Sequence, residues 1–214
     1  MPTGWSVVVP LKALAQAKSR LYADGSVTAD HDELVLALAL DTVTAALAAR
    51  AASRVVVVTD DQRASAALLR IGAIVIADGP GAGLNPALEY GASTARSLAP
   101  LDGIAVLPSD LPALRPIELD AALRAAAAPR AFVADADGIG TTLLTAQPGT
   151  PLDPRYGNGS RAAHAAGGAV ELTGDWPSLR RDVDTPAALH DAVELHVGEV
   201  TRAILAAGRH PTFT

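Results

Sequence analysis

Two patterns of apolar and polar positions follow one another along this chain. Short runs of valine, isoleucine and leucine predict buried β-strands, whereas longer stretches with apolar residues three or four positions apart predict helices. The alternation of the two favours an α/β fold in which helices cover both faces of a mostly parallel sheet. The predicted strands cover residues 5–9, 54–59, 73–77, 103–107, 131–134, 141–145, 169–172 and 179–184. The predicted helices cover residues 32–50, 62–71, 86–98, 116–128, 186–195 and 200–207.

Local signals support this order of elements. Asn85-Pro86 and Thr185-Pro186 each place a capping residue before a proline, which is typical of the first residues of a helix. The late strand pairs at 131–145 and 169–184 are expected to be additions to the sheet. No internal repeat or linker divides the chain, so residues 1–214 are predicted to form a single domain.

Composition narrows the function classes. Half of the residues are hydrophobic but only 3% are aromatic, so the core has to be built from small and branched aliphatic side chains. A net charge of −6 provides no global basic field, which argues against a nucleic-acid partner. The absence of cysteine excludes disulfides, zinc–thiolate sites and thiol nucleophiles.

No membrane partner is expected either. The first apolar run is short and is interrupted by Pro10, so it does not have the pattern of a secretory signal. The longest apolar stretch, residues 37–49, contains Asp41 and therefore does not predict a membrane span. These features predict a cytoplasmic protein.

Carboxylates stand near the ends of two predicted strands. Asp110 follows the fourth strand, and Asp182 and Asp184 lie two residues apart in the last one, so that their side chains share a face. Open α/β sheets bind ligands at the carboxyl ends of their strands, and carboxylates there can hold Mg²⁺. The structural alternatives are a turn at Asp110 and ion pairs from Arg180 and Arg181.

Basic residues gather in the first loop. The chain has two lysines, Lys12 and Lys18, and both follow the first predicted strand, with Arg20 beside them. Neither a G-x-G-x-x-G fingerprint nor a P-loop is present there. Such a loop can hold a triphosphate by direct charge, and its plain alternative is a solvated basic loop.

Two glycine-rich turns are candidates for anion binding. They are residues 138–142, which include Thr141, and residues 156–160, which include Gly157 and Ser160. Backbone N–H groups beside hydroxyls form anion-binding cradles, although the same residues also form ordinary turns and loops. His164 follows Ser160 by one helical turn and is expected to face the same cradle.

Several of these segments resemble one family in their order. V-P-L-K-x₅-K-S-R-L, G-L-N-P-A-L, S-D-L-P-A-L, D-G-I-G-T-T, P-R-Y-G-N-G-S-x₃-H and D-V-D-T-P-A-A-L are similar to the motifs of the CofC/FbiD guanylyltransferases, over residues 7–189. That family makes the guanylylated precursor of the deazaflavin coenzyme F-420. Residues 169–177 look like its actinobacterial branch, which implies phosphoenolpyruvate rather than 2-phospho-L-lactate as the acceptor.

The resemblance implies a fold and a set of roles. The fold is a three-layer α/β/α domain with a mostly parallel mixed sheet, of the nucleotide-diphospho-sugar transferase (MobA-like) type. Asp110 and Asp182 would hold Mg²⁺, with Asp184 in or beside that shell, and Lys18 would join Asp110 and Asp182 as a catalytic residue. The substrates, GTP and a small phosphorylated carboxylic acid, would be bound by Lys12, Lys18, Arg20, Asn85, Thr141, Gly157 and Ser160.

Some alternatives stay open at this stage. Asn85 would either bind the edge of a purine base or cap its helix. The apolar segment 32–50 would pack either in a homodimer interface or in the core. A downstream transferase is a further candidate partner. Ile139 and Asp137 depart from the family's usual residues, which leaves the shape of the acceptor loop undecided. The competing functions are a molybdopterin nucleotidyltransferase and a catalytically silent nucleotide-binding protein.

Overall fold

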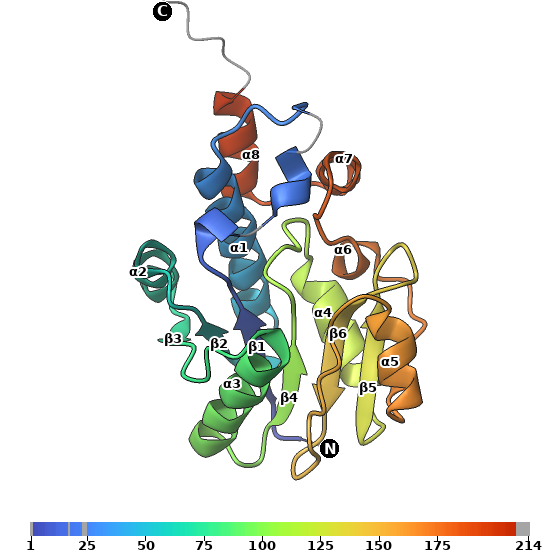
Figure 1. Ribbon diagram of the computed structural model, residues 1–214. Coiled ribbons are helices and arrows are strands. Elements are labelled where there is room, and N and C mark those ends of the chain that lie inside the picture. Colours follow the sequence, from blue (N-terminus) through green and yellow to red (C-terminus); the bar gives the residue numbers. More distant parts are fainter. Residues whose placement is uncertain (1, 17, 23–24, 209–214) are drawn as a thin grey trace, which may run out of the picture.

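A mixed β-sheet forms the centre of the molecule. The computed structural model describes residues 2–16, 18–22 and 25–208, and in this part seven strands form one sheet with the order β3-β2-β1-β4-β6-β5-β7 (Figure 1). The strands are β1 (Trp5–Pro10), β2 (Ala52–Val58), β3 (Ile74–Ile76), β4 (Gly103–Val106), β5 (Arg130–Ala134), β6 (Thr141–Ala146) and β7 (Val170–Glu171).

Strand direction decides which chain segments meet at one edge of the sheet. β1 is parallel to β2 and to β4, whereas β6 is antiparallel to both of its neighbours, β4 and β5. The first residue of β6, Thr141, therefore lies at the same edge as the carboxyl ends of β1, β4 and β5.

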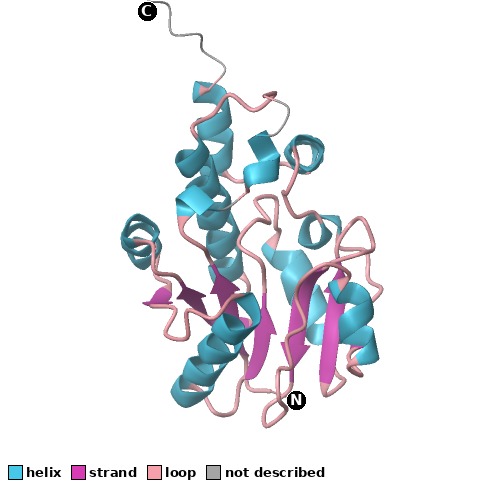
Figure 2. Ribbon diagram, in the orientation of Figure 1, coloured by secondary structure: helices cyan, strands magenta, loops and turns pink. Residues whose placement is uncertain are grey.

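Helices cover both faces of this sheet (Figure 2). The α-helices are α1 (His31–Ala48), α2 (Gln62–Arg70), α3 (Leu84–Leu98), α4 (Pro116–Ala125), α5 (Ser160–Ala166), α6 (Pro177–Arg180), α7 (Pro186–Glu194) and α8 (Glu199–Ala207). Two short 3₁₀ turns, η1 (Leu14–Gln16) and η2 (Ser19–Tyr22), follow β1. Helices α1, α2, α4 and α6 pack on one face, and α3 and α5 pack on the other. The expected three-layer α/β/α architecture is confirmed.

The interior strand β1 shows how the aliphatic core is divided. Its side chains alternate, so that Val7 and Val9 join the cluster under α1 while Val8 joins the cluster under α3. Helix α3 approaches the sheet very closely at Gly91, where an added Cβ atom would lie 2.7 Å from a methyl group of Val8 and 2.8 Å from one of Val58. Glycine is therefore required at this contact.

A third apolar cluster lies beyond the sheet and surrounds the first turns of α1. Leu34 and Leu38 of α1 meet Val183 and, on α7, Leu189. Helix α8 packs along α1, and the Asp41 carboxylate of α1 accepts hydrogen bonds from two main-chain N–H groups in the first turn of α8. This cluster brings the chain around residue 183 to the carboxyl edge of the sheet.

The predicted strand at 179–184 is wrong. Residues 177–180 form the short helix α6, and residues 181–184 belong to no strand. Pro177 takes the first helical position, and the N–H groups of Ser178 and Leu179 donate to Glu118 of α4 at 2.9 and 3.4 Å. Leu179 and Val183 are both buried, and their spacing is compatible with a strand. They belong to different hydrophobic clusters, however, because Leu179 is in the cluster that includes residues of α1 and α4, and Val183 is in the third cluster.

Three other local predictions also need correction. Helix α3 begins at Leu84 with Gly83 as its N-cap, so Asn85 lies inside the helix and does not cap it. Helices α5 and α6 are additional to the predicted set. The remaining predicted strands and helices are confirmed with shifts of a few residues at their ends. In the described part of the chain, no helix combines the length and the apolar character that a membrane crossing needs.

Candidate active site

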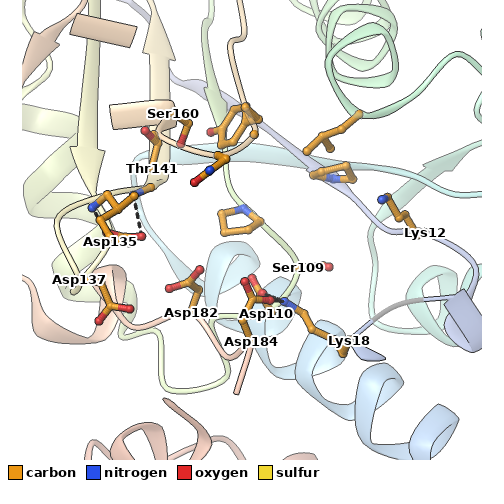
Figure 3. Close-up of a pocket in the computed structure, with 18 of the residues that line it drawn as sticks. Lys12, Lys18, Ser109, Asp110, Asp135, Asp137, Thr141, Ser160, Asp182 and Asp184 are labelled. Atoms are coloured by element: carbon orange, nitrogen blue, oxygen red, sulfur yellow. Dashed lines mark hydrogen bonds and ion pairs between the residues drawn. The ribbon is translucent and has the colours of Figure 1, made fainter. Parts of the chain in front are cut away.

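A cleft of about 880 Å³ opens along the carboxyl edge of the sheet. Its walls come from the ends of β1, β4 and β5, the start of β6, and the loops before α3 and α5. In Figure 3 the carboxylates of Asp110, Asp182 and Asp184 face one another, Thr141 and Ser160 lie together at one end, and Lys12 lies well apart from both groups. The volume is near the upper end of the usual range for ligand pockets, about 300–1,000 Å³.

Asp110 is the most deeply buried acid in the cleft. It follows β4 after Pro108 and Ser109, and only 5% of it is exposed. Its Oδ2 atom pairs with the Lys18 ammonium, whereas its buried Oδ1 atom has no hydrogen-bond partner among the described residues. Burial raises the pKa of Asp110, and the Lys18 charge opposes that shift. A buried, unpartnered carboxylate oxygen is a position at which a cation would be stabilised.

A single main-chain hydrogen bond brings the other two acids beside Asp110. The N–H of Val183 donates to the Asp110 carbonyl at 3.0 Å, and the Val183 side chain is fully buried. Asp182 and Asp184, on either side of Val183, both line the cleft. Burial, followed by the charges of Asp110 and Asp184, raises the pKa of Asp182 to about 7. The expectation that both acids share a side is therefore confirmed, although the segment is not a strand.

Lys18 connects these acids to the first loop. Its ammonium group forms ion pairs with Asp110 and Asp184. Burial works to lower the pKa of Lys18, but the two carboxylates outweigh it and raise the pKa above the ordinary value. Lys12 lines the cleft and is exposed. The side chain of Arg20, which was also predicted to bind phosphate, lies outside the described residues.

The structure does not join the two later acids to arginine. Among the described residues, Arg180 donates to main-chain carbonyls, including that of Ala134, and no ion pair links an arginine to Asp182 or Asp184. Arg181 instead pairs with Asp137 and with Asp191 of α7. Asp182 and Asp184 thus have no arginine partner among the described residues, and Asp184 pairs with Lys18 instead.

The described lining of the cleft is acidic overall. Its carboxylates outnumber its ammonium groups, since Asp110, Asp135, Asp137, Asp182 and Asp184 face only Lys12 and Lys18. Asp110, Asp182 and Asp184 lie in one part of the cleft, and Thr141 and Ser160 lie in another, with Asp135 beside them (Figure 3). An anionic ligand that bridged the two parts would require additional cations to offset repulsion by the acids.

The first glycine-rich turn is held by a carboxylate. Asp135, directly after β5, accepts hydrogen bonds from the N–H groups of Ile139 and Gly140 at 2.8 and 2.7 Å. A Cβ atom on Gly140 would clash with an Asp135 oxygen, so a side chain at position 140 would displace the carboxylate that holds the turn. Arg161 of α5 donates to the Gly138 carbonyl, which links the turn to the second glycine-rich loop.

The second glycine-rich loop is anchored from the opposite wall. The Asn85 amide nitrogen donates to the Tyr156 carbonyl at 3.0 Å, and the Asn85 amide oxygen accepts from the Tyr156 N–H at 2.9 Å. Both ends of this amide therefore position the loop. The role of Asn85 in substrate binding stays a prediction. Beyond the anchor, Gly157 and Ser160 line the cleft, and Ser160 is 3% exposed.

His164 lies behind the anion cradle predicted at residues 138–142 and 156–160, and not in it. It is 1% exposed, and its ring nitrogens lie 2.9 Å from the Thr141 hydroxyl and 2.9 Å from the Arg155 main-chain nitrogen. The expectation that His164 faces the cradle is thus corrected, because the side chain contacts the cradle through Thr141. Burial lowers the pKa of His164 to about 4.

A model of one protein family matches most of this chain. It describes the CofC-like guanylyl transferases and matches residues 5–168. The chain belongs to this family. A phosphoenolpyruvate guanylyltransferase from Geodermatophilus obscurus is 57% identical to it over 214 residues, which cover 97% of either chain. The resemblance inferred from the motifs is confirmed, and this CofC-like transferase is a nucleotidyltransferase.

Solved structures agree with the fold. A nucleotidyl transferase from Methanothermobacter thermautotroptrophicus has a TM-score of 0.64 at 22% identity, covering 90% of this chain and 98% of that one. A putative nucleotide-diphospho-sugar transferase from Desulfovibrio desulfuricans has a TM-score of 0.60 at 16% identity, covering 89% and 96%. At these identities the likeness shows the fold, and it confirms the expected fold type.

The cleft of this CofC-like transferase brings together most of the residues predicted from its sequence. Eight of them line it, namely Lys12, Lys18, Asp110, Thr141, Gly157, Ser160, Asp182 and Asp184. Sequence reasoning missed Ser109, Asp135 and Tyr156, which also line it. Asp135 follows a predicted strand, so the rule that identified Asp110 would have identified it too.

The buried His164 predicts an acid-sensitive component of stability. Its pKa of about 4 in the folded state lies below the ordinary value of 6.5, so between these values the unfolded state binds more protons and stability falls as pH falls. Arg155 and Arg130 reinforce the shift, and Asp153 opposes it. From about pH 7 to about pH 5, wild type should lose roughly 1–2 kcal/mol more than His164→Gln.

Urea unfolding of both proteins at the two pH values measures this difference. The exposed His190 provides the control, because His190→Gln should follow the pH dependence of wild type. Equal losses in wild type and His164→Gln would show that His164 is not neutral in the folded protein.

Proposed function

We propose that this chain transfers GMP from GTP to phosphoenolpyruvate and releases pyrophosphate, in the biosynthesis of coenzyme F-420. The observation that carries the proposal is the composition of one cleft. Buried carboxylates suited to a divalent cation and a hydroxyl-lined pair of glycine turns open into the same space. Family membership and the name of the Geodermatophilus relative, a phosphoenolpyruvate guanylyltransferase, support the reaction class and the acceptor.

Mg²⁺ is the cation that we propose for the acidic part of the cleft. Asp110 and Asp182 would hold it, with Asp184 beside them, and the unpartnered Oδ1 atom of Asp110 fits such a ligand. Within the described residues no cluster of three or more acidic, histidine or cysteine side chains is arranged as a ready metal site. Mg²⁺ commonly takes one or two carboxylates and completes its shell with water and substrate phosphates.

Lys18 would exchange its partners when substrates bind. Its ammonium group is held between Asp110 and Asp184. A triphosphate entering beside these acids offers new anionic partners, and Lys18, Lys12 and Arg20 would meet its phosphates. The bound Mg²⁺ would supply charge neutralisation between the carboxylates and the phosphates.

The chemistry then follows from the position of the two substrates. A phosphate oxygen of phosphoenolpyruvate attacks the α-phosphorus of GTP and forms the new P–O bond. The bond from the α-phosphorus to the bridging oxygen breaks, and its electron pair leaves with pyrophosphate. The nucleophile is already an anion, so no general base is needed. The residues of the cleft act by orienting two polyanions and reducing their repulsion.

The acceptor would occupy the end of the cleft that the glycine turns form. Thr141, Gly157 and Ser160 would bind its phosphate and carboxylate. The turn at residues 135–140 is rigidly bonded to Asp135, and α5 is linked to the same turn. Two glycine turns with hydroxyl groups suit the phosphate and carboxylate of a three-carbon acid better than a pterin. We therefore favour the phosphorylated acid over a molybdopterin acceptor.

Pyrophosphate release measured in parallel with two acids tests the proposed function. The purified chain is supplied with GTP and Mg²⁺ and either phosphoenolpyruvate or 2-phospho-L-lactate, and the nucleotide product is identified by mass spectrometry. We expect a GMP adduct of phosphoenolpyruvate. A downstream transferase added to the assay relieves inhibition by the product. Absence of any adduct when the downstream transferase is present would contradict the proposed function. An adduct with 2-phospho-L-lactate alone would show that this acid, and not phosphoenolpyruvate, is the acceptor.

Removing the Asp110 charge should abolish this turnover. Asp110→Asn keeps the shape of the side chain but weakens cation binding, so we expect the rate to fall by about 100-fold or more. The exposed Asp175, which does not line the cleft, provides the matched control Asp175→Asn. Turnover is followed by pyrophosphate release over a series of Mg²⁺ concentrations, and circular dichroism checks the fold. Normal turnover in Asp110→Asn would remove Asp110 from the metal site.

A further inference from the structure

His164 belongs to a buried chain of hydrogen bonds that ends at the cleft. Its Nε2 atom lies 2.9 Å from the main-chain nitrogen of Arg155, and its Nδ1 atom lies 2.9 Å from Oγ1 of Thr141. His164 itself does not line the cleft, whereas Thr141 does. The imidazole is therefore one contact away from the proposed acceptor.

The partners of the imidazole decide which nitrogen carries the hydrogen. A main-chain N–H can only donate, so the Arg155 N–H requires that Nε2 be unprotonated. A neutral imidazole has one N–H group, which must then be at Nδ1. The Nδ1–H group donates to the Thr141 hydroxyl oxygen, and the hydroxyl cannot use its own hydrogen in this bond.

The hydrogen of the Thr141 hydroxyl is consequently available to another acceptor. Among the described residues, the only hydrogen bond of this hydroxyl is that to His164. Thr141 and Ser160 lie together at the same end of the cleft in Figure 3. An anionic oxygen bound there would receive the hydrogen bond.

We propose that His164 is a positioning residue, which fixes the Thr141 hydroxyl as a hydrogen-bond donor toward an anionic oxygen of the phosphorylated acid. The identity of the acid rests on the proposed function. The arrangement of His164, Arg155 and Thr141 is independent of it, because it follows from hydrogen bonds within the protein.

The surroundings of His164 keep the imidazole neutral and in place. The Tyr156 ring packs edge-on at a centroid distance of 5.1 Å, and the Phe132 ring lies 5.9 Å away. Arg130 and Arg155 both pair with Asp153, which places basic and acidic groups together near the histidine. An aromatic, desolvated site disfavours the charged form, so the single N–H group is retained at neutral pH.

Two amide substitutions separate the two hydrogen bonds of His164. In His164→Asn, the amide nitrogen can take the place of Nδ1 and donate to Thr141, but the side chain is too short to reach the Arg155 N–H. In His164→Gln, the amide oxygen can take the place of Nε2 and accept from Arg155, while donation to Thr141 is lost. Thr141→Val removes the hydroxyl at constant shape, and Thr141→Ser retains it.

Steady-state kinetics with the two substrates varied separately test the proposal. His164→Gln and Thr141→Val should each raise the KM for the acid about 10-fold or more and leave the KM for GTP unchanged. His164→Asn should raise the KM for the acid less than His164→Gln does, and Thr141→Ser less than Thr141→Val, because each keeps the hydrogen-bonding group that its partner variant removes. The double variant His164→Gln/Thr141→Val should have the same KM for the acid as Thr141→Val alone, because His164 acts through Thr141. The proposal would be overturned if the two increases in the KM for the acid multiplied in the double variant. An equal rise in the KM for GTP would also overturn it.

A second measurement needs no turnover. Nitrogen-15 NMR of wild-type protein with labelled histidine distinguishes the two tautomers of a neutral imidazole, and His164→Asn assigns the signal of this residue. The proposal requires hydrogen at Nδ1. Hydrogen at Nε2, or a protonated ring at neutral pH, would overturn it. If no acid is guanylylated but the tautomer is as expected, the proposed function fails while the positioning of Thr141 stands.

Discussion

The buried negative charge of Asp110 is the constraint on which the arrangement of this cleft depends. A carboxylate that is 5% exposed needs a nearby cation, since burial alone disfavours its charged form. Lys18 provides that cation. The carbonyl of the same residue holds the N–H of Val183, and this bond sets Asp182 and Asp184 beside it. One residue at the end of β4 thus organises the first loop and the segment before α7.

The reversed direction of β6 explains how an acidic site and a hydroxyl site share one edge. β4 and β6 are neighbours in the sheet but run in opposite directions, so the end of β4 and the start of β6 lie at the same side. Asp110 follows the first and Thr141 begins the second. A fully parallel sheet would place the start of that strand at the far edge. The mixed sheet therefore suits a reaction between two anions, one near the acids and the other near the hydroxyls.

The outcome for particular residues shows what the sequence could predict. Asp110 was found because a carboxylate after an apolar run is a local pattern, and that pattern is reliable at the end of a buried parallel strand. Asp182 and Asp184 do line one cleft, but their segment is held by one hydrogen bond and by burial of Val183 rather than by a sheet ladder. The error arose because Pro177 begins a helix whose N–H groups bond to Glu118, 60 and 61 residues away.

The position of His164 could not be predicted for a similar reason. Its distance of one helical turn from Ser160 suggested the cradle itself, whereas its bonds go to Thr141 and Arg155 on other segments. Asn85 likewise carries the pattern of a helix cap but bonds to Tyr156, 71 residues along the chain. Local patterns identify candidate residues, but the bonds that decide their roles form between segments that are distant in sequence.

Anomalous diffraction from crystals that contain Mn²⁺ and a non-hydrolysable GTP analogue would test the central claim most directly, because Mn²⁺ accepts the same oxygen ligands as Mg²⁺. We expect an anomalous peak at about 2.1 Å from carboxylate oxygens of Asp110 and Asp182, with phosphate oxygens as further ligands. The Lys18 ammonium should no longer lie between Asp110 and Asp184. A bound nucleotide with the Lys18–Asp110 pair intact and the metal elsewhere would contradict it.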